Sequence, residues 1–251
     1  MNIGLYQGAA SLAALERWQE MVSQNIGASS VPGFKKNEMS FEAVLGGVKR
    51  TGTEGSFGKD VGSAMPLQRV QISMEPGELR STGNELDFAI QGGGFFQVQK
   101  PDGTTGYTRD GEFRLSPDRT IVTKQGFPVM GDGGPITLRP GGGRVTINPE
   151  GTIVQGETQV GKIAVYEFAD PSKLRRIGDG LLAPTDASAQ STTVEKPTVL
   201  GGSLESSNVS PLREMVNLIT VSRAYEANQK LIIANDESTG KAIQALGNPN
   251  Q

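Results

Sequence analysis

The sequence of 251 residues contains no cysteine and no histidine. Without cysteine the chain can form no disulfide, no thiolate nucleophile and no cysteine-ligated zinc or iron–sulfur site. Without histidine it has neither a Ser-His-Asp triad nor an imidazole metal ligand. These two absences exclude most classes of hydrolase and metalloenzyme. Carboxylate pairs, lysine nucleophiles and oxygen-only metal sites are the chemistries that they leave open.

An excess of charge of one sign is also lacking. Lys and Arg number 24 and Asp and Glu number 27, which gives a net charge of −3. No five like charges are consecutive, whereas a nucleic-acid-binding protein usually carries a basic face. No apolar stretch approaches the ~18–20 residues that a membrane span requires. We therefore expect neither nucleic-acid binding nor membrane insertion.

Carboxylates are the remaining candidates for catalysis. Those of the central region could pair as in glycosidases; they are Asp87, Asp102, Asp110, Glu112, Asp118 and Glu150. The single tryptophan, Trp18, lies outside that region of the sequence. The Gly92–Gly94 triplet lacks the Lys-Ser/Thr pair of a phosphate-binding loop, so it predicts a tight turn between strands. We therefore predict no catalytic residue, no cofactor site and no metal site, with a β-rich carbohydrate-binding or carbohydrate-cleaving module as the remote alternative.

A seven-residue repeat marks the N-terminal segment. Residues 2–26 contain no proline, and their apolar residues follow two spacings of seven that lie three residues apart. The apolar members are Leu5, Leu12, Leu15, Val22 and Ile26. This a/d pattern is typical of an amphipathic helix. The sequence Val31-Pro32-Gly33 predicts that the chain leaves the helix there.

The C-terminal segment repeats this design. Ser210-Pro211 predicts a helix start, because serine caps the first turn and proline fits its first position. The heptad positions that follow include Leu218, Val221, Tyr225, Asn228, Ile232 and Leu246. Residues 208–251 carry four basic and four acidic side chains, so the segment is neutral.

Each terminal helix alone would expose its apolar stripe, at a cost of roughly 25 cal/mol per Å². We therefore predict that the two helices pair as a coiled coil, with the heptad residues as its assembly seam. Polar Asn228 at a d-like position favours a coil that docks against copies of itself, since buried polar residues fix register and oligomer state. A two-helix lid on a β-rich core is the alternative.

The central region has the pattern of β-structure. Short apolar runs alternate with turn residues from about Val70 to Leu204, and no helical periodicity intervenes. Arg109 is expected to pair with a carboxylate or a carbonyl beside a hairpin at Asp110-Gly111. The predicted fold is mixed α and β, with a terminal helical domain (1–30 with 208–251), an extended or flexible connector (31–69) and a β-rich domain (70–207).

Several stretches together resemble the bacterial flagellar hook–basal-body rod family. They are NIGASSVPGF at 25–34, LDFAIQGGGFFQV at 86–98, YTRDGEF at 107–113 and LESSNV at 204–209. The stretches GFPVMG at 126–131 and GGPI at 133–136 are most similar to the proximal-rod branch, with the distal-rod branch as the alternative. A phage-tail-like or adhesin-type structural component is a further alternative class.

The resemblance implies a structural, non-enzymatic axial subunit of the flagellar basal-body rod. It would polymerise through its terminal helices and transmit torque. Its implied partners are copies of itself, neighbouring flagellar rod subunits and the flagellar type III export apparatus. The resemblance also implies a location in the periplasmic rod without a cleaved signal peptide. That agrees with residues 1–15, which carry no Lys or Arg and form a poor signal peptide.

Overall fold

The computed structural model describes residues 3–44, 65–186 and 189–247. The chain divides into two compact units. The first comprises Met1–Ser23, Asn37–Gln71 and Met215–Gln251, and the second comprises Gln24–Lys36 and Ile72–Glu214. The predicted class, a mixed fold with a helix at each end and a β-rich central region, is confirmed.

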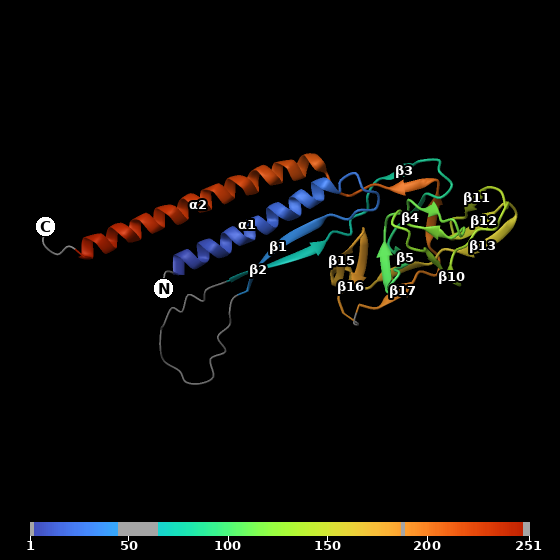
Figure 1. Ribbon diagram of the computed structural model, residues 1–251, viewed down its shortest axis with the longest axis horizontal. Coiled ribbons are helices and arrows are strands. Elements are labelled where there is room, and N and C mark those ends of the chain that lie inside the picture. The colour runs from blue at the N-terminus through green and yellow to red at the C-terminus, as the bar shows by residue number, and fades with distance from the viewer. Residues whose placement is uncertain (1–2, 45–64, 187–188, 248–251) are drawn as a thin grey trace, which may run out of the picture. The chain divides into compact units, whose positions relative to one another are not determined.

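Two long helices dominate the first unit. Helix α1 spans Ile3–Gly27 and helix α2 spans Pro211–Gly247, and they run alongside each other in opposite directions (Figure 1). The start of α2 is as the sequence predicts, because the Ser210 carbonyl accepts the Glu214 N–H at 3.0 Å. None of the helices in the described residues has the length and apolarity that a membrane crossing needs.

A two-stranded sheet completes the first unit. Strand β1 (Asn37–Val44) pairs with β2 (Met65–Ile72). The connector expected over residues 31–69 therefore contains regular strands in its described parts, and its Gly-rich centre, 45–64, lies outside the described residues. Regular alternation of apolar and polar residues, as at Met39, Phe41 and Ala43, is the signal for β1.

The second unit is built of short antiparallel strands. Its largest sheet has six strands in the order β15-β16-β6-β5-β14-β17. They are Leu174–Gly178 (β15), Leu181–Pro184 (β16), Thr105–Thr108 (β6), Phe95–Gln99 (β5), Val165–Phe168 (β14) and Ser191–Thr193 (β17). A single 3-10 turn, Pro171–Lys173, is the helical element that the described part of residues 72–210 contains.

Smaller sheets surround this one. A three-stranded sheet joins β11 (Val145–Ile147), β12 (Thr152–Gln155) and β13 (Thr158–Lys162). The two-stranded pairs are β3 (Leu79–Ser81) with β19 (Ser203–Glu205), β4 (Phe88–Gln91) with β18 (Thr198–Gly201), β7 (Arg114–Leu115) with β8 (Ile121–Val122), and β9 (Met130–Gly131) with β10 (Gly134–Pro135). The pairs β3–β19 and β4–β18 bring the two ends of the β-rich stretch together.

An aromatic core holds these sheets together. The Phe113 ring packs edge-on against Phe96 at 5.3 Å and lies 5.9 Å from Phe88, and all three are buried. The Gly92–Gly94 triplet forms the predicted turn, between β4 and β5. The hairpin expected at Asp110-Gly111 is wrong, because β6 pairs with β5 and β16 rather than with β7. Gly111 instead lets the Phe88 carbonyl approach, since a Cβ there would lie 1.6 Å from that oxygen.

Candidate functional site

The terminal helices carry the predicted assembly seam. Leu5 lies on α1 and Leu246 on α2, but the side chains of both are outside the described part of the structure. Leu15, Val22 and Val221 are buried. The half-buried members are Leu12, Ile26, Leu218, Tyr225, Asn228 and Ile232. The described seam residues of α2 therefore lie on its covered face.

Two contacts fix how α1 faces α2. The Tyr225 hydroxyl donates a hydrogen bond to Glu16 Oε1 at 3.1 Å, which raises the pKa of Tyr225. A Cβ placed on Gly8 would lie 2.7 Å from Cγ1 of Ile232. Because glycine has no side chain, Ile232 can pack against α1 at this position. From one contact to the other, the residue number rises from Gly8 to Glu16 on α1 and falls from Ile232 to Tyr225 on α2. The two helices are therefore antiparallel in a single register.

On the face opposite the seam, the first turns of α2 carry exposed apolar side chains. Met215 is 50% exposed, Val216 58% and Ile219 55%, and Leu231 and Ile233 further along are also exposed. On a helix with 3.6 residues per turn, positions 215, 216 and 219 share one face. We call these three residues the bare face. A large exposed apolar group of this kind is typical of a protein–protein contact.

The second unit contains a buried charge cluster. The Glu205 carboxylate at the end of β19 accepts from Lys35 Nζ at 2.6 Å, from Arg109 Nε at 2.5 Å and from the Gly77 N–H at 2.8 Å. The side chains of Lys35 and Arg109 are 5% exposed and that of Glu205 is 2% exposed. These three side chains form the Glu205 cluster, which joins residues far apart in the sequence.

Arg109 extends the cluster into the glycine turn. Its Nη1 donates to the Gly94 carbonyl, and its Nη2 donates to the carbonyls of Gly92 and Ile90. The expectation that Arg109 pairs with a carboxylate or a carbonyl is thus confirmed. Because one guanidinium engages both the turn and Glu205, Arg109 fixes the backbone between β4 and β5.

The protonation of the cluster follows from its two cations and one anion. Burial alone would raise the pKa of Glu205, but Arg109, Lys35 and the Gly77 N–H together hold that pKa below its ordinary value. Burial lowers the pKa of Lys35, and the attraction of Glu205 only partly offsets this effect. The nearby Arg109 adds to the lowering of the Lys35 pKa.

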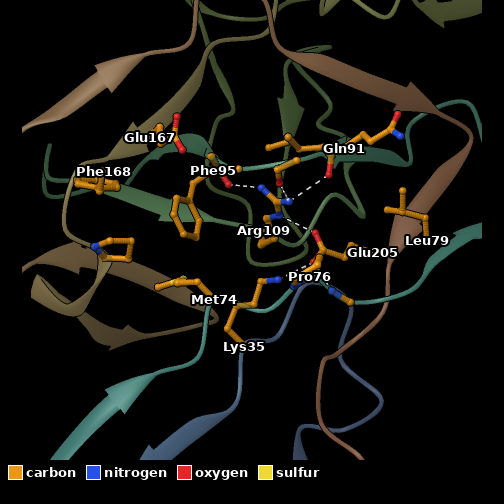
Figure 2. Close-up of a pocket in the computed structure, with 16 residues that line it drawn as sticks. Lys35, Met74, Pro76, Leu79, Gln91, Phe95, Arg109, Glu167, Phe168 and Glu205 are labelled. Atoms are coloured by element: carbon orange, nitrogen blue, oxygen red, sulfur yellow. Dashed lines mark hydrogen bonds and ion pairs between the residues drawn. The ribbon is translucent and has the colours of Figure 1, made fainter.

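A pocket of about 460 Å³ opens beside the cluster (Figure 2). Apolar side chains line it together with the cluster, including Met74, Pro76, Leu79, Phe95 and Phe168. The polar atoms of Arg109 and Glu205 are engaged with other parts of the chain, as the dashed lines in Figure 2 show. The Glu205 cluster therefore links loops of the second unit, and its charged groups are engaged in those links.

Three of the carboxylates considered for catalysis accept hydrogen bonds from residues nearby in the sequence. Asp87 accepts from Thr82 Oγ1 at 2.6 Å and from Asn84 Nδ2 at 2.9 Å. Asp102 accepts the Thr104 N–H at 2.9 Å within the turn between β5 and β6. Burial raises the pKa of Asp110, which accepts the Glu112 N–H at 3.0 Å. In the described residues no group of three or more acidic side chains is placed to hold a metal ion.

Comparison with protein-family models gives two matches. Residues 89–155 match the flagellar hook protein FlgE/F/G D1 domain. Residues 200–245 match the C-terminal domain of the flagellar basal body rod FlgEFG proteins. The first match contains Arg109 and the glycine turn, and the second contains Glu205 and most of α2.

Individual relatives align along nearly the whole chain. The flagellar basal-body rod protein FlgF of Rhizobium meliloti is 34% identical over 98% of this chain and 99% of its own length. FlgF of Caulobacter vibrioides is 34% identical over the whole of both chains. FlgG of Buchnera aphidicola subsp. Acyrthosiphon pisum is 33% identical over 96% of this chain and 98% of its own length. The chain therefore belongs to the flagellar basal-body rod protein family, and it is a structural rod subunit, not an enzyme.

Proposed function

We propose that this rod subunit polymerises through its terminal helices and transmits torque along the axis of the basal body. In this proposal residues 1–30 and 208–251 form the rod-core domain, and residues 70–207 form the β-rich domain. The partners are copies of the same chain and neighbouring rod subunits. The observation that carries the proposal is the bare face of α2.

The bare face explains why the chain would need neighbours. Met215, Val216 and Ile219 are each at least half exposed although α2 already packs on α1 with its other side. Burial of a large apolar side chain contributes about 1.5–3 kcal/mol. A subunit that repeats along an axis would gain this contribution at every copy. The seam inside the chain and the bare face outside it thus have different roles.

The seam supports pairing of α1 and α2 as an antiparallel coiled coil. Its register follows from the Gly8–Ile232 and Glu16–Tyr225 contacts, and Val22 and Val221 are completely buried. Small residues such as Gly8 allow close approach of helices. The assembly role of the seam is therefore to present α2 in a fixed orientation, with the bare face outward.

We assign the chain to the proximal-rod branch. Four relatives named FlgF align over 98–100% of it at 30–34% identity, and the stretch 126–136 is similar to that branch. The distal-rod branch is the second candidate, because FlgG relatives reach 33% identity. Replacement of flgF or of flgG in a flagellated host by this coding sequence distinguishes the two. Restored swimming in the flgF replacement alone supports the proximal assignment.

Delivery to the rod would use the flagellar export apparatus without cleavage of a signal peptide. This part of the proposal rests on what membership of the rod family implies. Mass spectrometry of the subunit recovered from purified basal bodies measures whether its N-terminal region is intact. Loss of an N-terminal segment would contradict uncleaved export.

Substitution on the bare face tests polymerisation through α2. Ile219→Asp places a charge where a neighbour would bury an apolar group, so the variant is expected to be absent from isolated basal bodies. Circular dichroism of the purified monomer should remain unchanged, since Ile219 is 55% exposed. Thr220→Asp, at the adjacent exposed position, is the matched control. Normal incorporation of the Ile219→Asp protein would refute the role of the bare face.

A further inference from the structure

The chain passes between its two units four times. The divisions fall after Ser23, Lys36, Gln71 and Glu214. Inside the second unit, three segments carry these passages: Gln24–Lys36, the stretch that begins at Ile72 and the stretch that ends at Glu214. We call residues 33–36, 73–78 and 205–208 of these segments the junction. All of its hydrogen bonds described below lie within the second unit.

Asn208 lies in the third junction segment, and its side chain bonds to both of the other two. Its Oδ1 accepts the Lys36 N–H at 2.7 Å. Its Nδ2 donates to the carbonyls of Ser73 at 3.2 Å and of Glu75 at 3.0 Å. Its own backbone N–H donates to the Phe34 carbonyl at 3.2 Å. An asparagine suits this position because its amide both donates and accepts.

Glu205 makes a second set of connections between the same segments. Its carboxylate accepts from Lys35 Nζ in the first segment and from the Gly77 N–H in the second. Its backbone carbonyl accepts the Gly33 N–H at 2.7 Å. Lys35 Nζ also donates to the Glu75 carbonyl at 2.8 Å. The two sets together leave each segment bonded to both of the others.

Backbone contacts and a glycine complete the junction. The Ser73 N–H donates to the Lys36 carbonyl at 2.9 Å, and the Ser206 N–H donates to the Glu78 carbonyl at 2.8 Å. A Cβ on Gly77 would lie 1.9 Å from the Ser206 carbonyl oxygen, so glycine is required for this approach.

We propose that Asn208, supported by Glu205, is a positioning residue that ties the three passage segments into one body, so that a force arriving through any one of them is shared by all three. The role is local. It concerns how the chain enters and leaves the β-rich unit, and it differs from a contribution to the core around Phe96. The proposal does not depend on whether the terminal helices polymerise.

Hydrogen exchange of the purified full-length protein tests this role. In Asn208→Ala all three side-chain hydrogen bonds are lost, so the amides of Lys36 and Ser73 are expected to exchange at least roughly tenfold faster. Asn208→Asp keeps an acceptor for the Lys36 N–H but loses both donated bonds. It should therefore accelerate exchange of the Ser73 N–H, which is bonded across the junction to the Lys36 carbonyl, while the Lys36 N–H stays protected. Amides of β5 and β6 should exchange at the wild-type rate in both variants.

The matched control is Asn84→Ala. Asn84 lies in the same unit and donates from Nδ2 to Asp87 Oδ1, away from the junction. It should leave the Lys36 and Ser73 amides unchanged. The proposal is overturned if Asn208→Ala leaves these two amides at the wild-type rate. It is also overturned if β5 and β6 accelerate as much as the junction, since Asn208 would then be a general stabilising residue.

Discussion

Glu205 lies between two cations, Lys35 and Arg109, and the three side chains are almost completely buried. Because the cluster has two positive charges and one negative charge, its members should contribute unequally to the stability of the fold. Removal of the carboxylate leaves two cations buried without an anion, whereas removal of Lys35 leaves a balanced pair. Burial of an unpaired charge is among the most destabilising changes in a protein.

Glu205→Gln should therefore destabilise the β-rich unit strongly, by on the order of 3–5 kcal/mol. Lys35→Met should cost less, about 1–2 kcal/mol, because Glu205 keeps Arg109 and the Gly77 N–H. Urea denaturation followed by circular dichroism measures both values. Glu85→Gln, in an exposed pair with Arg144, is the control and should have little effect. Equal losses for the Glu205 and Lys35 variants would contradict the unequal roles.

The acid stability of the protein should depend on the same carboxylate. The folded-state pKa of Glu205 is below its ordinary value of 4.5, so its stabilising contribution is fully present above pH 4.5. The contribution is lost as the pH falls through the folded-state pKa. The difference in unfolding free energy between wild type and Glu205→Gln should therefore shrink below pH 4.5. The pKa of Asp110 is shifted in the opposite direction, since burial raises it. Asp110→Asn should therefore not reproduce this pH dependence.

At the scale of elements, the close approach of α1 and α2 depends on glycine at position 8. Gly8→Leu should force Ile232 away and lower the thermal stability of the helices, because a Cβ alone would lie 2.7 Å from Cγ1 of Ile232. Ile232→Ala makes room, so the double variant should recover part of the loss. Thermal melting of the four proteins gives the coupling energy. Additive effects of the two changes would contradict the antiparallel register.

Asn228 should be replaceable with a gain in helix stability. Its Nδ2 donates to the Ala224 carbonyl one turn earlier, and its side chain is half-buried. Asn228→Leu should therefore stabilise helix association by about 1 kcal/mol, with a loss of specificity in register or partner. Thermal melting measures the gain, and cross-linking of single-cysteine variants measures register. A destabilised variant would show that the amide has a further role.

Sequence periodicity predicted the helices well, because a repeat of seven depends only on neighbouring turns. It also indicated the covered face of α2, where Val221 is completely buried. The bare face was not recognised, since Met215, Val216 and Ile219 fit any amphipathic pattern. The sequence predicts β1 only as part of an extended or flexible connector, although Met39 and Phe41 alternate with polar residues.

The Glu205 cluster could not be predicted from neighbouring residues in the sequence. The glycine turn and a partner for Arg109 were expected from nearby residues, and both are present. Glu205 itself lies 96 residues from Arg109 and 170 from Lys35 along the chain. No spacing rule connects such distances, because only the tertiary fold brings these residues together. The sequence distinguishes Glu205 only as part of the LESSNV stretch at 204–209.

For the whole molecule, self-association should depend weakly on salt. The C-terminal region from residue 208 carries four charges of each sign, and the net charge of the chain is −3. If apolar burial drives assembly, sedimentation of the purified chain between roughly 0.05 and 0.5 M salt should show little dissociation. A polymer that dissolves over this range would instead indicate assembly through ion pairs.

The β-rich stretch begins and ends at the same place, because the Asn208 side chain holds the Ser73 carbonyl at 3.2 Å and β19 pairs with β3. A stretch with adjoining ends can accept an insertion without displacement of the points at which it is attached. An insertion in an exposed turn of this stretch, such as Pro101–Gly103, would therefore leave Ser73 and Asn208 in place.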